Sequence, residues 1–449
     1  MGFGWILEWV FGWIYSSLLA GVLVIGSPYW LVRMATSGRY RAGLWGRLGF
    51  VPRELVQWRK TVGRVVWVHA VSVGEVLVAA RLIEEFRRVR PELRFAVSTT
   101  TKTGQELAKT RLGLGSAFGC GVFYLPLDFG FAVRRYLRVL RPEMLVLMES
   151  ELWPNLLAEC GRVGVPVAVA NARVSDRSFP RYMRLRRLWR PLMERVAVFL
   201  AQSEETAERL GAIGAPRVRV SGNVKYDAKV GGESQVAGLI REQAAGRAIV
   251  VAGSTVEGKT VYEEDVVMQA MWGERGVWEQ IPEVLLVLAP RHPQRFGYAY
   301  SLGLEFGVVS ATEMLEGKRA TGTARQTVVL DTIGDLAAVY GVADVAFVGG
   351  SLVRKGGHNP LEAARFGVPV VMGPSYENFR EIVERMRAAD GIRIVEDQDE
   401  LAKALGELLT DRVAAKALGE RGQRVFEEQQ GATERTVTAL VELLPGGAR

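Results

Sequence analysis

The chain has 449 residues, of which 49% are hydrophobic and 24% charged, and it shows no low-complexity tract or internal repeat. These values exclude an intrinsically disordered chain and predict two globular domains, because one domain usually takes about 100 to 200 residues. The formal net charge of +8 favours an anionic partner. A phosphorylated substrate and an anionic membrane are both partners of this kind. We expect no nucleic-acid partner, because no recognisable binding module accompanies the charge.

The first 45 residues have the composition of a membrane anchor. No charged residue occurs from Trp9 to Val32, a length close to the roughly 20 residues that cross a bilayer. Arginines follow only on the carboxyl side, which predicts that this side lies in the cytosol. We therefore expect a single-pass anchor with its basic flank over residues 1–45. A helix lying in the membrane interface is the alternative, because glycines and Pro28 interrupt the segment.

From about residue 46, β-rich runs alternate with helical patterns, which is typical of a doubly wound α/β domain. We expect a first Rossmann-like domain over residues 46–227, with strands at 65–71, 94–99, 122–127, 144–148, 165–170 and 198–202. Its segment 181–195 is rich in arginine, which fits either a solvated helix face or a membrane-facing patch.

The rest of the chain repeats the alternating pattern. A polar stretch over residues 228–247 is predicted to be a linker, and a second Rossmann-like domain is expected over residues 248–430, followed by a helix and tail over 431–449. Its strands are expected at 248–252, 284–289, 328–330, 345–348, 368–372 and 392–395. The fold class is therefore α/β with two domains facing a cleft, because ligands bind beyond the carboxyl ends of parallel strands.

Cysteine and histidine usage argues against a metal site. Cys120 and Cys160 are not in a CxxC pair, and the three histidines, His69, His292 and His358, lack ligand spacing. We therefore expect no metal and no cofactor, and a reducing, cytosolic setting. The DxD sequence at Asp397 fits helix capping better than metal binding.

A glycine-rich stretch over residues 349–374 is the most informative part of the second half. Asn359 and Pro360 are predicted to open a helix after the glycines, and backbone N–H groups at such a start bind phosphate. Glu362 on the first turn is placed to accept hydrogen bonds from ribose hydroxyls. A tight strand-to-helix connection without ligand explains the same residues, so both interpretations stay open at this point.

In the first half, Ser72 and Glu75 have the spacing of a capping box. Capping alone explains this spacing. Glu75 also follows the first predicted strand, where a cleft-facing carboxylate can take a proton from an attacking hydroxyl.

Nine segments taken together, in chain order, resemble the bacterial lipid A Kdo transferases, which attach 3-deoxy-D-manno-octulosonic acid (Kdo) to a lipid A precursor. The segments are SVGE (72–75), YLPLD (124–128), MESELWPN (148–155), NARVSDRS (171–178), GNVKYD (222–227), GSTVEG (253–258), PRHPQRF (290–296), DTIGDL (331–336) and GGHNPLEAA (356–364). The resemblance covers nearly the whole chain. It implies an inverting, metal-independent glycosyltransferase of the GT-B type that uses CMP-Kdo as donor and the lipid A precursor lipid IVA as acceptor.

The resemblance also implies roles for particular residues. Glu75 would be the general base, and Glu149 and Lys225 would stabilise the transition state. The residues implied to bind CMP are Pro290, Arg291, Gly334, Asp335, Leu336, Asn359, Pro360, Leu361 and Glu362. The implied location is the inner membrane, with the catalytic domains on its cytosolic face and membrane lipids as further partners.

The chain departs from the family pattern in two places. The family usually reads GSTHEGEE, whereas this chain has Val256, Lys259 and Thr260 at three of those positions, and Asp335 replaces a more common glutamate. Two other functions remain open. One is a sugar-nucleotide epimerase of the same fold, which would need no anchor, and the other is a catalytically silent, membrane-bound scaffold that binds sugar nucleotides.

Overall fold

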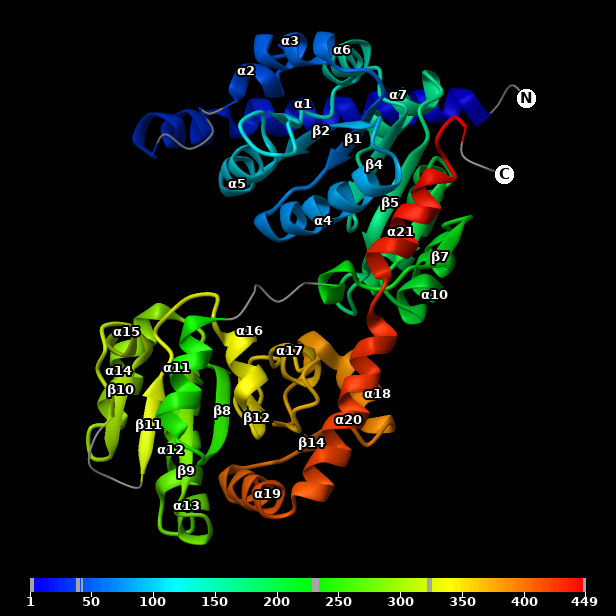
Figure 1. The fold of residues 1–449 in the computed structure, drawn as a ribbon. Helices are drawn as coiled ribbons and strands as arrows, with labels where there is room; N and C mark the ends of the chain where they lie inside the picture. Colours follow the sequence, from blue (N-terminus) through cyan, green and yellow to red (C-terminus); the bar gives the residue numbers. More distant parts are fainter. Residues whose placement is uncertain (1–3, 38–40, 42, 228–233, 321–324, 447–449) are drawn as a thin grey trace. The chain divides into compact units, whose positions relative to one another are not determined.

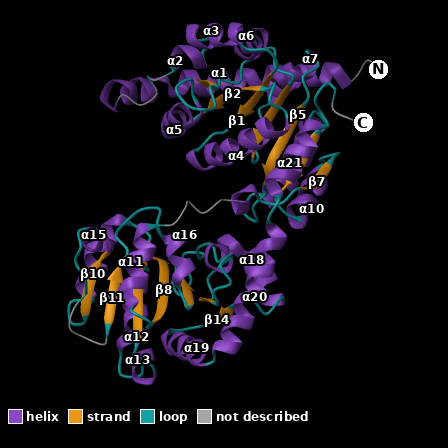
Figure 2. Cartoon of the chain, viewed as in Figure 1, coloured by secondary structure: helices purple, strands orange, loops and turns teal. Residues whose placement is uncertain are grey.

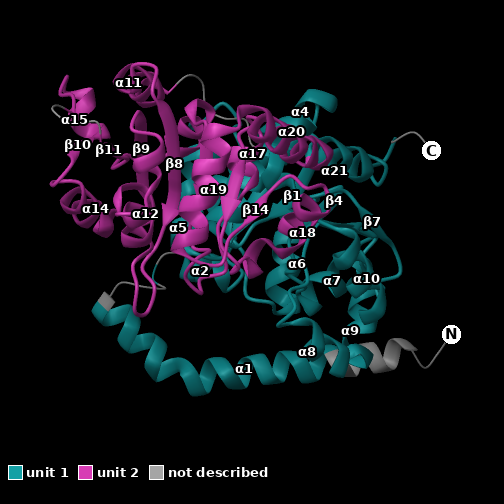
Figure 3. Ribbon diagram, turned by 90° about the horizontal axis from the view of Figure 1, so that it is seen from below, with its two compact units in different colours: residues 1–227, 430–449 teal, residues 228–429 magenta. Residues whose placement is uncertain are grey.

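The computed structural model describes residues 4–37, 41, 43–227, 234–320 and 325–446 (Figure 1). The chain forms two compact units, residues 1–227 with 430–449 (unit 1) and residues 228–429 (unit 2), coloured separately in Figure 3. Each unit contains one seven-stranded sheet, and the paired strands are parallel. Helices cover the strands in both units (Figure 2). The predicted fold class, two doubly wound sheets with an apolar helix at the amino terminus, is confirmed.

Unit 1 has the strand order β3-β2-β1-β4-β5-β6-β7. Its strands are β1 (Val65–His69), β2 (Arg94–Thr99), β3 (Gly121–Tyr124), β4 (Met144–Met148), β5 (Val167–Ala172), β6 (Val198–Ala201) and β7 (Val218–Val220). Its helices are α1 (Gly4–Ser37), α2 (Leu44–Arg47), α3 (Arg53–Thr61), α4 (Val73–Val89), α5 (Lys102–Leu112), α6 (Gly130–Leu140), α7 (Pro154–Arg162), α8 (Phe179–Arg184), α9 (Arg186–Met193), α10 (Glu204–Ile213), η1 (Val224–Asp227) and α21 (Ala432–Val441).

Unit 2 has the strand order β10-β11-β9-β8-β12-β13-β14. Its strands are β8 (Ala248–Thr255), β9 (Val284–Pro290), β10 (Gly307–Ser310), β11 (Gln326–Val329), β12 (Val345–Val348), β13 (Val370–Met372) and β14 (Arg393–Ile394). Its helices are α11 (Gln235–Ala244), α12 (Glu263–Trp272), α13 (Val277–Gln280), η2 (Pro293–Arg295), α14 (Phe296–Leu302), α15 (Ala311–Leu315), α16 (Leu336–Val339), η3 (Tyr340–Val342), α17 (Leu361–Ala364), η4 (Glu377–Phe379), α18 (Arg380–Ala388), α19 (Gln398–Thr410) and α20 (Arg412–Gln429).

The central strands are apolar throughout because helices cover both faces of each sheet. In β1, Val66 and Val68 pack into a core shared with α4, α5 and α21. Val65 and Trp67 point to the opposite face and pack with α3, α6 and α7. Because the strands of this sheet are parallel, the polar loops that follow them lie together at its carboxyl edge.

Two strands, β7 and β10, were not predicted from the sequence. Both are short and lie at the outer edge of a sheet, and the side chains of β7 are largely exposed. An edge strand with exposed side chains lacks the continuous apolar run that identifies the central strands, so the sequence pattern gives little signal there.

The predicted linker over residues 228–247 is wrong for residues 235–244, which form α11. Ser234 caps this helix, and Val236 and Ile240 are buried on one face of it. The polar composition of the stretch hides this apolar face, because only one side of an amphipathic helix contacts the core. Gln243 further ties α11 to unit 2 by donating to Gln326.

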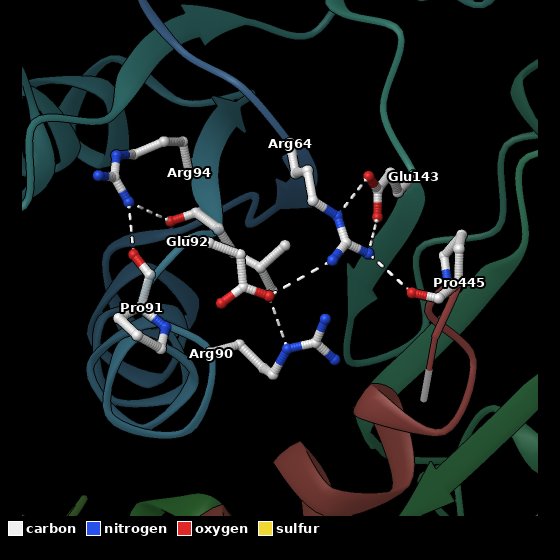
Figure 4. A network of polar contacts seen from close by, with 8 residues as sticks. Arg64, Arg90, Pro91, Glu92, Arg94, Glu143 and Pro445 are labelled. Carbon is white, nitrogen blue, oxygen red and sulfur yellow. Dashed lines mark hydrogen bonds and ion pairs between the residues drawn. The ribbon is translucent and has the colours of Figure 1, made fainter. Parts of the chain in front are cut away.

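The helix at the carboxyl terminus, α21, belongs to unit 1. It packs against α4, and the Asp227 carboxylate accepts hydrogen bonds from the backbone of Gly431 and Thr433 at its start. Beyond the helix, Arg64 donates to the Pro445 carbonyl and forms a two-pronged ion pair with Glu143, which follows α6 (Figure 4). Helix α21 and Pro445 therefore pack on the first unit rather than on the second.

Candidate functional site

Three acidic side chains and one lysine gather at the carboxyl edge of the unit 1 sheet. Glu75 lies on the first turn of α4 after β1, and Glu149 directly follows β4. Glu151 lies two residues further on, and Lys225 lies in η1. The doubly wound topology brings these four groups together, although 150 residues of sequence separate Glu75 from Lys225.

Glu75 is held in place by the start of its own helix. One carboxylate oxygen accepts a hydrogen bond from the Val71 backbone N–H at 2.8 Å, and the other accepts one from the Ser72 hydroxyl at 2.9 Å. The side chain is largely buried, and burial raises the pKa of Glu75 while these hydrogen bonds oppose the rise. The capping role inferred from the sequence is confirmed. A fixed, partly desolvated carboxylate of this kind is also a suitable general base.

Glu149 and Lys225 form an ion pair, with 3.0 Å between the carboxylate oxygen and the ammonium nitrogen. The Glu149 backbone has a φ of 58°, a left-handed conformation that is strained for a residue with a side chain. Its N–H donates to the Ala170 carbonyl in the neighbouring strand β5. Both side chains are partly exposed, so the pair contributes little to stability and is accessible to a ligand.

The segment that carries Lys225 is fixed by hydrogen bonds with two side chains, Asn171 and Arg81. The Asn171 side-chain oxygen accepts from the Val224 N–H at 3.1 Å, and Asn171 itself has a left-handed φ of 55°. The Arg81 guanidinium of α4 donates to the carbonyls of Val224 and Lys225. These contacts hold η1 at the carboxyl edge of the sheet, next to the turn after β4.

Glu151 was missed by the sequence reasoning. Burial raises its pKa, and the negative charges of Glu75 and Glu149 add to the rise. Glu151 therefore lies within electrostatic reach of both carboxylates. Glu151 stands in MESELWPN, two residues after Glu149, and this position could have marked it as a candidate site residue. The predicted base thus belongs to a cluster of three carboxylates beside one ammonium group.

In unit 2, Arg291, His358 and Glu362 interact at the carboxyl ends of β9 and β12. Burial raises the pKa of Glu362, and the Arg291 charge opposes the rise. Burial, together with the neighbouring Arg291 and His292 charges, lowers the pKa of His358 to about 4. His358 is therefore neutral at pH 7, which leaves Arg291 as a cation beside a carboxylate. His358 was not among the predicted site residues, although it stands in GGHNPLEAA.

The helix predicted after Asn359 is present but short. α17 spans four residues, and the Asn359 side chain accepts a hydrogen bond from the Leu361 N–H at 3.2 Å. Pro360 directly precedes the helix, and Leu361 is buried on its first turn. A helix of one turn has only a small dipole, so the predicted contribution of a helix dipole to phosphate binding is weaker than expected.

The glycine loop before α17 is organised by a buried acid, Glu263, at the start of α12. Its carboxylate accepts hydrogen bonds from four backbone N–H groups, those of Val256, Gly350, Ser351 and Leu352. Burial raises the pKa of Glu263 to about 6, although all four bonds favour the charged form. One side chain thus fixes the turn after β12 and the loop after β8.

Two buried acids lie just after the positions where the chain departs from the GSTHEGEE pattern. A bridge between Glu257 and Tyr262 closes a small hairpin, and the two acids follow it as Glu263 and Glu264. They stand four residues later than in the pattern. Glu264 is fully buried and pairs with Arg295 at 3.0 Å. Two acids are therefore present close to this loop, although not at the positions that the pattern gives them.

The remaining predicted residues lie on neighbouring loops of unit 2. Pro290 ends β9, and Gly334 has a left-handed φ of 103° just before α16. Asp335 accepts a hydrogen bond from the Ser234 hydroxyl at 2.8 Å, and Leu336 begins α16. Since β9, β11 and β12 belong to one parallel sheet, these loops lie at the same edge as Arg291.

Within the described part of the chain, no group of three or more His, Cys, Asp or Glu side chains is arranged to hold a metal ion. The Asp397 carboxylate of the DxD sequence accepts a hydrogen bond from the Glu400 N–H and caps α19. Its predicted capping role is confirmed.

Two family models match this chain, one largely within each unit. Residues 42–228 match the family model described as 3-deoxy-D-manno-octulosonic-acid transferase (kdotransferase), and residues 313–425 match that of glycosyl transferases group 1. The chain is 32% identical to the 3-deoxy-D-manno-octulosonic acid transferase of Haemophilus influenzae over 94% of this chain and 93% of that protein. It is 34% identical to the transferase of the same name from Bordetella pertussis, over 84% of this chain and 87% of that protein.

Among solved structures, the UDP-GlcNAc 2-epimerase from Neisseria meningitidis bound to UDP-GlcNAc superposes with a TM-score of 0.52. The match covers 82% of this chain and 99% of the epimerase, at 12% sequence identity. At that identity the likeness shows the fold alone.

Proposed function

The chain belongs to the 3-deoxy-D-manno-octulosonic acid transferase family, and on this premise we propose that it transfers Kdo from CMP-Kdo to the lipid A precursor lipid IVA. The membership makes it a glycosyltransferase that takes a sugar nucleotide as donor and a lipid as acceptor. The observation that carries the finer proposal is the cluster of Glu75, Glu149 and Lys225 in unit 1, because its groups suit proton removal and charge stabilisation during glycosyl transfer.

In this proposal Glu75 removes the proton from the acceptor hydroxyl that attacks the sugar. Its hydrogen bonds to Val71 and Ser72 orient the carboxylate, and its raised pKa makes it a stronger base than an exposed glutamate. Glu149 stabilises the positive charge that develops on the sugar ring, and Lys225 stabilises developing negative charge. The ion pair between them keeps both groups in place before substrate arrives.

The donor is proposed to bind the loops of unit 2. Arg291 pairs with the CMP phosphate, and backbone groups of Pro290, Gly334, Asp335 and Leu336 line the nucleotide. A second group of residues, after β12, holds the ribose and the phosphate: Asn359, Pro360, Leu361 and Glu362. The turn that leads to them is fixed by Glu263, which supports a preorganised loop. No step in this scheme needs a metal ion, because Arg291 and Lys225 carry the positive charge.

A lipid acceptor and an apolar helix at the amino terminus both fit work at a membrane. The described residues include one helix segment, residues 12–36, that is long and apolar enough to cross a bilayer, with a mean hydropathy of 1.5. We place the protein at the inner membrane, with both units on the cytosolic face, because the arginines that follow the apolar segment are attracted to the anionic cytosolic leaflet.

A direct assay tests the function. Purified full-length protein is incubated with CMP-Kdo and tetra-acylated lipid A precursor, and the lipid product is analysed by mass spectrometry. We expect the lipid to gain one or more Kdo units and the reaction to persist in EDTA. An epimerase would change a soluble sugar nucleotide and leave the lipid unmodified, and a silent scaffold would consume no donor. Unmodified lipid would therefore refute the proposal.

Replacing Lys225 by Gln is expected to lower kcat by about 100-fold, the usual effect of losing one group that stabilises developing charge. The exposed pair with Glu149 contributes little to folding, so the melting temperature should change by no more than a degree or two. Lys225→Arg keeps the charge and should restore part of the activity. Steady-state kinetics and thermal unfolding measure both effects. Unchanged kcat in Lys225→Gln would remove the lysine from the mechanism.

A further inference from the structure

The long helix α1 exposes an apolar surface that the described residues of the protein do not cover. Ile25 is 83% exposed and Val24 is 71% exposed, and other large apolar side chains along the helix are exposed by more than half. The exposed set also includes Trp13, Ile14, Leu18, Val22, Tyr29, Leu31 and Val32. Such a surface is stable in contact with lipid rather than water.

The amino-terminal half of α1 is docked on unit 1 by polar contacts. The Asn155 side chain, on the first turn of α7, donates to the Ser16 hydroxyl at 3.0 Å. The Tyr15 hydroxyl hydrogen-bonds to Asp128, whose carboxylate also accepts the N–H groups of Asn155 and Leu156. Gly12 lies against the Asn155 side chain, where an added Cβ would be 3.7 Å away. Figure 1 shows α1 running from α7 toward α2.

The chain is tied to unit 1 again shortly after α1 ends. The Tyr136 hydroxyl of α6 donates to the Gly46 carbonyl in α2 at 3.0 Å. The Leu127 N–H donates to the Arg47 carbonyl, and the Arg47 guanidinium stacks over Tyr124 at 4.5 Å. These contacts pack α2 against β3 and α6. The chain is therefore fixed to unit 1 on both sides of the exposed part of α1, at residues 12–16 and at α2.

These two attachments conflict with a helix that crosses the membrane. Residues 17–37 are about 31 Å long as a helix, close to the roughly 30 Å of the hydrocarbon layer. If they crossed the bilayer, Ser37 would lie on the far side from unit 1. The six residues 38–43 that lead back to α2 reach only about 20 Å when fully extended. The docked helix thus cannot cross the bilayer while α2 stays packed.

We propose that α1 lies along the cytosolic leaflet of a phospholipid bilayer, with residues 12–16 docked on the start of α7, and that it does not cross the membrane. This departs from the single-pass anchor predicted from the sequence. Apolar side chains of α1 enter the leaflet, and Tyr29 with Arg33 stacked over it at 5.5 Å suits the headgroup region.

An in-plane helix would also position the carboxylate cluster. Glu149 and Glu151 lie in the turn between β4 and α7, and the first turn of α7 contacts α1. A docked α1 therefore fixes the height of these carboxylates above the membrane surface. The importance of this fixed height for catalysis rests on the proposed function, because the height matters only if the acceptor is a lipid that arrives from the bilayer.

Cross-linking of the full-length protein in native membranes tests the proposed contact between residues 12–16 of α1 and the start of α7. Cys120 and Cys160, both buried, are replaced by Ala, and Ser16→Cys is combined with Asn155→Cys. We expect oxidation to join the new cysteines, so that neither reacts with a maleimide-PEG after denaturation. The matched control, Ser27→Cys with Asn155→Cys, places the first cysteine about 16 Å further along the helix and should stay reduced. If the cysteines of Ser16→Cys with Asn155→Cys stay reduced, the proposed contact between α1 and α7 is wrong.

Labelling from outside the cell separates the two orientations. A cysteine at Gly4 (Gly4→Cys) in the same background is treated with a membrane-impermeant maleimide on intact spheroplasts. An in-plane helix keeps this residue on the cytosolic side, so labelling is expected only after permeabilisation. Thr36→Cys serves as the cytosolic control. Labelling of Gly4→Cys on intact spheroplasts overturns the proposal, and neither experiment depends on transferase activity.

Discussion

Replacing Glu75 by Gln is expected to lower kcat for Kdo transfer by about 100- to 10,000-fold, the usual contribution of a general base. The amide keeps the shape of the side chain but cannot take the proton of the acceptor hydroxyl. Loss of the carboxylate also weakens the start of α4 by about 0.5 to 2 kcal/mol, as for other helix caps. CMP binding should be unchanged, because the residues proposed to hold CMP are in unit 2. Kinetics, thermal unfolding and calorimetry with CMP measure the three quantities separately.

Ser72→Ala is the matched control for this prediction. It removes the other half of the cap but leaves the carboxylate of Glu75 available as a base. The Ser72 hydroxyl lowers the pKa of Glu75, so its removal should raise that pKa further. A base acts only when ionised, and activity therefore rises with pH through the pKa of Glu75. We expect Ser72→Ala to retain most of its maximal activity, with the acidic limb of the pH profile moved to higher pH.

The two results together identify the role of Glu75. If Glu75→Gln and Ser72→Ala lose similar, small amounts of stability and both retain transfer, Glu75 is only a cap and the base is a different group. Glu151 is then the next residue to test, because it is partly buried and its pKa is also raised.

The central strands were predictable because burial on both faces produces an uninterrupted apolar run. β2, β4 and β12 have the bounds expected from the sequence. The pattern fails where one face or one edge is solvated, as in β7, and where an amphipathic helix has a mostly polar composition, as in α11. In both cases tertiary contacts supply stability that local composition does not show.

Residues of the candidate site were easiest to single out from the sequence where a strand end and a helix-capping pattern fall in one motif. Glu75 stands at a strand end and also caps a helix, so two independent signals mark it. Glu263 has no such mark, because its four hydrogen-bond donors come from loops after two different strands. Likewise, the docking of α1 depends on Asn155, which is 139 residues away from Ser16 in sequence. Long-range pairings of this kind are created by the topology and leave no periodic pattern.

Replacing Glu263 by Gln is expected to destabilise unit 2 and to weaken CMP binding more than any other single change to its glycine loop. Each carboxylate oxygen accepts two backbone N–H groups, and an amide supplies one acceptor oxygen and one NH₂ group. Two buried N–H groups would then face a donor instead of an acceptor. Each unsatisfied group costs about 1 to 3 kcal/mol.

The loss should therefore amount to about 2 to 6 kcal/mol in the free energy of unfolding, measured by denaturant titration. Because Glu263 holds Gly350, Ser351 and Leu352 in one turn, part of this loss should also appear as weaker CMP binding in calorimetry. Glu305→Gln makes the same chemical change at an exposed position of unit 2 and should alter neither quantity. If Glu263→Gln lowers stability but binds CMP as the wild type does, the turn after β12 does not contact the donor. The nucleotide would then be held by the Arg291 and Asp335 loops alone.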